Sequence, residues 1–112
     1  MTIRLKEGYD IFMATIRLVT EVTESLTDAY RLLIPQLSSS SNPPTSEALQ
    51  RIIDSDSAQI LIAEDENGSI LGTMTLIIFH IPTGIRAWIE DVVVDSSARG
   101  KGIGKTLNLA AL

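Results

Sequence analysis

Cysteine is absent from the 112 residues, which excludes a disulfide framework, a thiolate zinc site and a cysteine nucleophile. Histidine is almost absent too. His80 is the only one, so it has no partner for a catalytic triad or a metal site, and we expect it at the surface and expect no bound metal. A chain without cysteine fits a reducing compartment, and we therefore expect a cytoplasmic protein.

Long apolar runs are missing as well. Runs such as residues 76–79 are too short to cross a bilayer, so we expect no membrane partner. Charged residues such as Arg4, Lys6 and Glu7 interrupt any secretory signal at the N-terminus. A basic surplus is also missing, because the formal net charge is −5, and we expect no nucleic-acid partner.

The chain does contain enough apolar residues, 45%, to form one small globular domain. β-branched residues in near alternation predict a strand over residues 14–19. Ser25 and Asp28 have the spacing of a helix N-terminal capping box, and Pro35 should end or kink the helix that follows. A second, short helix is predicted from about residue 46.

Three strands are predicted next, over residues 58–64, 70–79 and 86–95. Asn67 and Gly68 predict a two-residue hairpin turn, since both central positions of a type I′ turn take positive φ. A glycine loop and a last helix follow. This order predicts an α/β (α+β) fold with a mixed, mainly antiparallel sheet flanked by helices.

Residues 1–12 look detached from the rest of the sequence. Met13 is a second candidate for the first residue of the protein. We therefore divide the chain into an N-terminal extension, residues 1–12, and a domain over residues 13–112.

The loop before the last helix combines glycines with concentrated positive charge. Glycines let a ligand approach the backbone, and the first N–H groups of a helix have no intrahelical partner, so the pattern is typical of phosphate binding. Positive charge gathered on an acidic protein indicates a small anion rather than a polymer. The residues of the loop are Arg99, Gly100, Lys101, Gly102, Ile103, Gly104 and Lys105.

Two known phosphate loops fit this segment poorly. In the nucleotide-binding P-loop, G-x-x-x-x-G-K-[ST], the first glycine would lie one residue before Gly100. The dinucleotide fingerprint G-x-G-x-x-G fails because the glycines here are spaced G-x-G-x-G, after a strand that ends an antiparallel meander. A glycine loop with a purely structural role stays open as the alternative.

A third pattern, [QR]-x-x-G-x-[GA], matches residues 99–104, and the preceding strand reads Trp-Ile-Glu-Asp-Val-Val-Val-Asp over residues 88–95. Loop and strand resemble the pyrophosphate loop and fourth strand of the GNAT acyltransferases. The order of elements over residues 14–112 is similar to the first two thirds of that family. The resemblance implies an N-acetyltransferase that uses acetyl-coenzyme A (acetyl-CoA) as cosubstrate.

The resemblance also implies roles for individual residues. The backbone of Val92, Val93 and Val94 would hydrogen-bond the pantetheine arm and the thioester carbonyl, with one N–H as oxyanion donor. The loop amides from residues 99 to 105 would hold the pyrophosphate. Glu90 is the first candidate to take the proton of an amine acceptor and Asp91 the second; strand alternation would put them on opposite faces of the sheet. A solvent-facing or cap-forming carboxylate is the alternative for each.

The acceptor implied by the resemblance is a small-molecule or protein amine. The Ile-Glu-Asp-Val-Val-Val-Asp run is also similar to glucosamine-phosphate N-acetyltransferases, which favours an amino sugar, but GNAT proteins of unknown substrate are equally similar. The family continues with strands and a helix that follow this point, so we expect a C-terminally truncated copy that gives no turnover alone. A non-catalytic CoA-binding or interaction remnant is the alternative. Exposed sheet edges favour association, which makes a homodimer an option.

Overall fold

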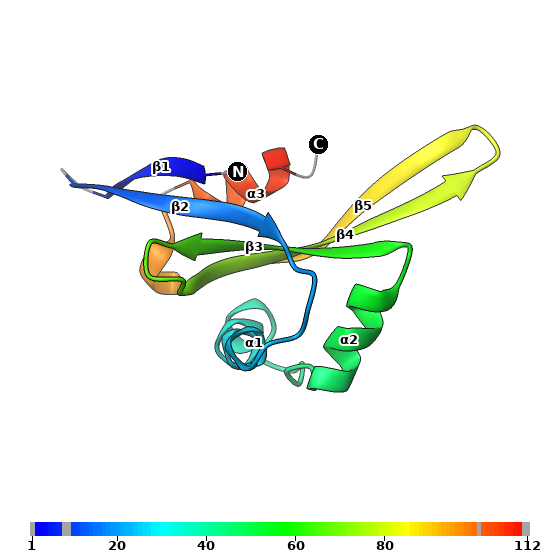
Figure 1. The fold of residues 1–112 in the computed structure, drawn as a ribbon, viewed down its shortest axis with the longest axis horizontal. Helices are drawn as coiled ribbons and strands as arrows, with labels where there is room; N and C mark the ends of the chain where they lie inside the picture. Colours follow the sequence, from blue (N-terminus) through cyan, green and yellow to red (C-terminus); the bar gives the residue numbers. More distant parts are fainter. Residues whose placement is uncertain (1, 8–9, 101, 111–112) are drawn as a thin grey trace.

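The computed structural model describes residues 2–7, 10–100 and 102–110, and its five strands form one antiparallel sheet in chain order (Figure 1). The predicted order of strand, two helices, three strands and helix is confirmed from the second strand onward. The elements are β1 (Thr2–Glu7), β2 (Asp10–Leu18), α1 (Glu24–Leu37), α2 (Ser46–Asp54), β3 (Ala58–Asp65), β4 (Ile70–Ile81), β5 (Gly84–Val94), a 3₁₀ turn (Ser96–Ala98) and α3 (Ile103–Ala110).

Helices cover both faces of the sheet, α1 and α2 on one and α3 on the other (Figure 1). Each face has its own apolar core, because side chains alternate along a strand. The core under α1 and α2 consists of Val19, Leu26, Tyr30, Ile34, Leu49, Ile60 and Ile62. The core under α3 consists of Ala14, Ile16, Ala63, Met74, Ala98, Ile103 and Leu107.

The N-terminal segment is continuous with the sheet. β1 pairs with β2 from Thr2↔Thr15 to Glu7↔Asp10, so the first strand of the predicted domain begins earlier than residue 14. The domain boundary at residue 13 stays a prediction.

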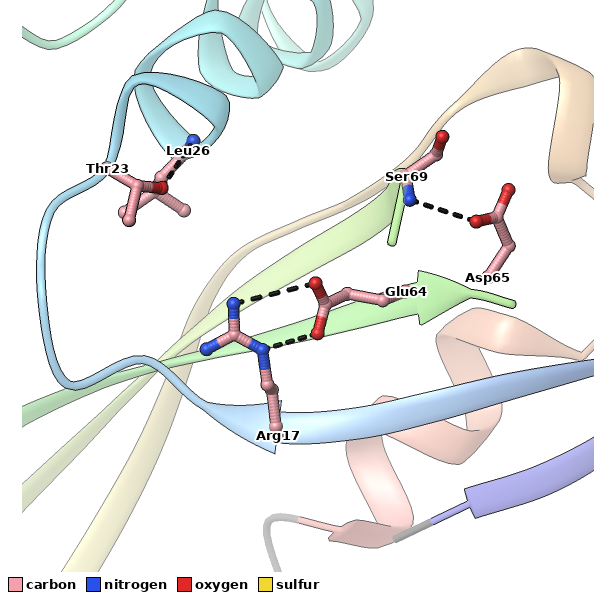
Figure 2. Close-up of polar contacts among 6 residues, drawn as sticks. All are labelled: Arg17, Thr23, Leu26, Glu64, Asp65 and Ser69. Atoms are coloured by element: carbon pink, nitrogen blue, oxygen red, sulfur yellow. Dashed lines mark hydrogen bonds and ion pairs between the residues drawn. The ribbon is translucent and has the colours of Figure 1, made fainter. Parts of the chain in front are cut away.

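α1 begins and ends differently from the sequence expectation. Its N-terminal cap is Thr23, whose Oγ1 accepts the N–H of Leu26 at 3.1 Å (Figure 2), so the capping box at Ser25 is wrong. The helix runs through Pro35 to Leu37, and the N–H of Ser38 still donates to the carbonyl of Ile34 at 2.8 Å. Proline is tolerated here because it removes only its own N–H, one turn from the helix end.

The turn between β3 and β4 differs from the predicted type I′ turn: the N–H of Asp65 donates to the carbonyl of Ser69 at 2.9 Å, so these two residues close a loop of three residues, 66–68. The Oδ1 atom of Asp65 accepts the N–H of Ser69 at 2.9 Å (Figure 2). It also accepts the N–H of Asn67 at 2.9 Å, and within this turn only Gly68 takes positive φ, +81°. The aspartate side chain thus stabilises a type I turn closed by a left-handed glycine. Beside it, Arg17 and Glu64 form an ion pair between β2 and β3 (Figure 2).

β4 and β5 are longer than predicted, and their distal ends form a hairpin that extends beyond the helices (Figure 1). The strands pair as far as Ile81↔Gly84, and His80 is exposed there, as expected. In the described part of the chain, no helix has the length and apolar character needed to span a membrane.

Gly72 of β4 marks the closest approach of β4, β5 and α3. A Cβ at this position would lie 3.0 Å from the carbonyl oxygen of Val93, 3.3 Å from Cγ2 of Val94 and 3.5 Å from Cγ2 of Ile103. The absence of a side chain at Gly72 therefore lets the end of β5 and the start of α3 pack on β4.

We predict that Gly72→Ala lowers the free energy of unfolding by about 1–3 kcal/mol, because backbone atoms of β5 would have to shift. Gly104→Ala is the matched control, since a Cβ there meets only Cγ2 of Val94 at an ordinary 3.7 Å. Urea unfolding followed by circular dichroism measures both. Equal stability of the two variants would contradict the close-approach argument.

Candidate functional site

β5 carries one extra residue opposite β4. Thr73 pairs with Val93 and Thr75 with Glu90, so Met74 alone faces both Asp91 and Val92. Asp91 takes φ +51°, the only positive φ of a non-glycine residue among those the structure describes. This is a β-bulge, which bends the strand and interrupts the hydrogen-bond ladder at one point.

Beyond the bulge, the outer edge of β5 presents backbone groups that no described strand covers. The N–H of Asp95 donates to the carbonyl of Leu71 at 2.8 Å, which makes this a hydrogen-bonded pair. Hydrogen-bonded and open pairs alternate in an antiparallel ladder, so Val94 turns its N–H and C=O outward and Val93 turns them toward β4. Of the three valines singled out from the sequence, Val94 thus presents its N–H at the outer edge, whereas its carbonyl accepts a hydrogen bond from Arg99.

The glycine loop adopts a backbone that only glycine takes easily. Gly100 has φ +83° and Gly102 has φ +84°, and no atom lies within 4 Å of a Cβ built at either, so conformation rather than space requires glycine. Lys101 lies outside the described residues. The loop therefore has open space beside its backbone.

α3 starts directly after this loop. The N–H of Thr106 donates to the carbonyl of Gly102 at 3.0 Å, while N–H groups before it lie in the turn that has no helical acceptor. The Ile103 side chain is buried in the core, and Lys105 is exposed. Because Val94 packs against the first turn of α3 at Gly104, the strand edge and the helix N-terminus form one continuous surface.

Arg99 does not extend over the loop as a free phosphate ligand. Its Nε–H donates to the carbonyl oxygen of Val94 at 3.0 Å, and its terminal amino group donates to Oε1 of Gln36 at 3.5 Å. The guanidinium group instead connects β5 to the end of α1.

Sequence reasoning missed Gln36. Its amide donates to Oδ1 of Asp95 at 2.9 Å and accepts the N–H of Ser96 at 2.8 Å. Hydrogen bonds from Ser97 and Gln36 hold the pKa of Asp95 below its usual value. No local pattern indicates this contact, because Gln36 and Asp95 are 59 positions apart.

A pocket of about 280 Å³ opens beside the bulge, between α1, the loop to α2, α2 itself, and strands β4 and β5. Its wall is largely apolar and hydroxylic, and Asp91 is its one charged lining residue. The lining residues are Tyr30, Ile34, Leu37, Ser38, Ser41, Asn42, Pro44, Leu49, Ile52, Thr75 and Asp91.

The bulge also changes where the two carboxylates point. Glu90 pairs with Thr75, which lines the pocket, and Asp91 lines the pocket as well. Because cross-strand neighbours share a face, both residues belong to the α1 face, and the expectation of opposite faces is wrong. Glu90 and Asp91 are both exposed, but Glu90 accepts a hydrogen bond from the indole N–H of Trp88 and does not line the pocket, so Asp91 is the carboxylate at the pocket.

Tyr30, which lines the pocket, forms a buried hydrogen bond 2.8 Å long between its hydroxyl and Oγ1 of Thr73. Burial raises the pKa of Tyr30; the hydrogen bond to Thr73 opposes this rise, and the charge of Asp91 adds to it. This pair fixes α1 to β4 directly beneath the bulge.

The acetyltransferase (GNAT) family matches residues 20–112. The chain belongs to this family. Among curated proteins none matches it. The family resemblance inferred from the loop and the strand is thereby confirmed.

Solved structures of acetyltransferases share the fold. The aminoglycoside acetyltransferase meta-AAC0020 from an uncultured soil metagenomic sample, in complex with sisomicin, matches with TM-score 0.71 and 25% identity over 87% of this chain. The chain spans 66% of the length of that enzyme. A Trypanosoma brucei acetyltransferase (TM-score 0.67) and a transcriptional regulator from Bacillus halodurans C-125 (TM-score 0.71) are each 27% identical, over 88% of this chain and 71% of theirs.

We predict that Tyr30→Phe lowers stability by about 1–3 kcal/mol near neutral pH, because it leaves the Thr73 hydroxyl buried without its partner. Adding Thr73→Val to Tyr30→Phe should restore part of the loss, since both polar groups are then gone.

The difference between wild type and Tyr30→Phe should shrink as the pH rises above about 10. The folded state holds the phenol proton of Tyr30 more tightly than the unfolded state does. The contribution of the Tyr30 hydroxyl to stability is therefore complete below the pKa of Tyr30 in the unfolded chain, and it is lost as the pH rises through the pKa of Tyr30 in the folded chain. Urea unfolding across that range measures the difference. A constant difference would contradict the raised pKa of Tyr30.

Proposed function

We propose that this domain binds acetyl-CoA and transfers its acetyl group to the nitrogen of an amine held in the pocket beside Asp91. The observation that carries the proposal is the alignment along β5. The bulge, the free edge at Val94 and the N-terminus of α3 follow one another within 13 residues, 91–103, and the pocket opens at the bulge.

The residues present fit the two parts of acetyl-CoA that a protein backbone can bind. The outward N–H of Val94 suits an amide of the extended pantetheine arm, which would lie along the edge of the sheet as an added strand does. The N–H groups of Ile103, Gly104 and Lys105 suit the pyrophosphate, with the helix dipole and the Lys105 ammonium adding positive charge. Acetyl-CoA brings the activated thioester to this surface.

The bulge supplies a donor for the developing oxyanion in this proposal. Backbone groups of Asp91 and Val92 share Met74 as their one opposite residue, so the regular ladder does not use all of them. An N–H released in this way stabilises negative charge on a carbonyl oxygen most effectively if it is already oriented.

Asp91 is the residue that we propose for the acceptor amine, ahead of Glu90. Its carboxylate attracts an ammonium group into a largely uncharged pocket and then accepts its proton, directly or through water. The complex of meta-AAC0020 with sisomicin supports a small-molecule amine, such as an amino sugar, as the acceptor class. The homodimer and the cytoplasmic location stay predictions.

Isothermal titration of the 112-residue chain with acetyl-CoA tests the proposal. We predict binding by the wild type and a loss of roughly 5- to 30-fold in affinity for Gly102→Ala, because an alanine at positive φ costs about 1–2 kcal/mol. Gly68→Ala is the matched control. It places the same strain, φ +81°, in the turn between β3 and β4, with equally open space around it, so it should leave binding unchanged.

Absence of acetyl-CoA binding by the wild type would overturn the proposal. Equal affinity of Gly102→Ala and Gly68→Ala would show that the glycine loop does not bind acetyl-CoA. The prediction that the chain gives no turnover alone is checked by following thiol release with a panel of amines. Amine-dependent release supports the proposed acetyl transfer and contradicts that expectation, whereas binding without thiol release agrees with it and favours the non-catalytic CoA-binding function.

A further inference from the structure

Gln36 uses every hydrogen-bonding position of its side-chain amide. Its Nε2 group donates to the carbonyl of Leu32 at 3.1 Å and to Oδ1 of Asp95 at 2.9 Å. Its Oε1 atom accepts from the N–H of Ser96 at 2.8 Å and from Arg99 at 3.5 Å. An amide has two donor and two acceptor positions, so its orientation is fully determined.

These contacts connect two parts of the candidate site. On one side of Gln36, the next residues of the chain, Leu37 and Ser38, line the pocket. The hydrogen-bond partners of Gln36 lie in the segment that leads from the end of β5 into the glycine loop. They are Asp95, Ser96 and Arg99.

Apart from Gln36, other contacts hold the segment from 95 to 99: the N–H of Asp95 donates to the carbonyl of Leu71 at 2.8 Å, the Nε–H of Arg99 donates to the carbonyl of Val94 at 3.0 Å, and Ala98 is buried in the core under α3. The 3₁₀ turn is closed by the N–H of Ala98 to the carbonyl of Asp95, 2.9 Å, and by the Ser97 hydroxyl to Asp95, 2.6 Å. Both bonds are internal to the turn. Gln36 adds side-chain hydrogen bonds that connect Asp95, Ser96 and Arg99 to α1.

We propose that Gln36 is a positioning residue for anion binding: its amide holds the turn at residues 95–99 so that the glycine loop and the first turn of α3 are preformed for a diphosphate. This inference rests on the proposed function, because the ligand it serves is acetyl-CoA. Preformed sites bind more tightly, since the loop is ordered before the ligand arrives. Gln36 touches no reacting atom and acts through Asp95, Ser96 and Arg99.

Two measurements on the full 112-residue chain test the proposal with Gln36→Leu. In the free protein, amide hydrogen exchange over residues 95–100 should accelerate about tenfold, the effect of losing a hydrogen bond to a charged group. In calorimetric titrations, the dissociation constant for acetyl-CoA should rise by a similar factor, about tenfold.

Two further variants separate positioning from a general loss of stability. Gln50→Leu removes the same type of bond, from Gln50 to Asp54 at 2.8 Å within α2, and should change neither readout. The double variant Gln36→Glu with Asp95→Asn reverses donor and acceptor between the two side chains, since the asparagine amide can donate to the new carboxylate. It should recover most of the affinity that Gln36→Glu alone loses through repulsion of Asp95.

Unchanged exchange at residues 95–100 in Gln36→Leu would overturn the proposal, whatever the affinity. Accelerated exchange with unchanged acetyl-CoA affinity would also overturn it, because Gln36 would then stabilise the turn without affecting binding. Failure of the wild type to bind would overturn the proposed function and the positioning role together, whereas binding by the wild type with no response in the variants overturns this inference alone.

Discussion

The extra residue at Asp91 is the constraint on which the arrangement of the site depends. It places two residues of β5 opposite one of β4, and it turns both Glu90 and Asp91 toward the face covered by α1. The positive φ of Asp91 carries a conformational cost, which aspartate bears better than most residues. Regular strand pairing on both sides of the bulge holds the backbone of Asp91 in this conformation, so the strain persists in the folded chain.

Two close contacts on opposite faces of the sheet keep the bulge in register with its surroundings. On one face, the Tyr30 hydroxyl and Thr73 join α1 to β4. On the other, the missing side chain of Gly72 lets α3 approach the end of β5. The pocket and the helix N-terminus are thus set by different packing interactions, although both are positioned relative to the same strand.

The sequence predicted elements that depend on local pattern, and it missed features that depend on distant partners. Periodicity identified β3, β4 and α2, and the glycine spacing identified the start of α3. The bulge escaped because the Ile-Glu-Asp-Val-Val-Val run contains no glycine and reads as an ordinary strand; its register is set by β4. Gln36 escaped because its partner, Asp95, is distant in the chain. The cap at Thr23 and the turn at Asp65 were misjudged by choosing between neighbouring polar residues, each of which can cap or close a turn.

The proposed function lets an acidic protein bind a diphosphate, because the proposed contacts come from backbone N–H groups rather than from net charge. Positive-φ glycines leave open space beside the N–H groups, whereas Arg99, the most conspicuous cation of the loop, is engaged with Val94 and Gln36. The pocket proposed for the acceptor is built from other segments: α1, the loop to α2, α2 itself, and β4 and β5 at the bulge. If the proposed function holds, substitutions in that wall change which amine is bound without altering the glycine loop, provided that the last turn of α1 still presents Gln36 to the turn at Asp95. In that proposal the choice of acceptor and the anion site depend on the same helix end.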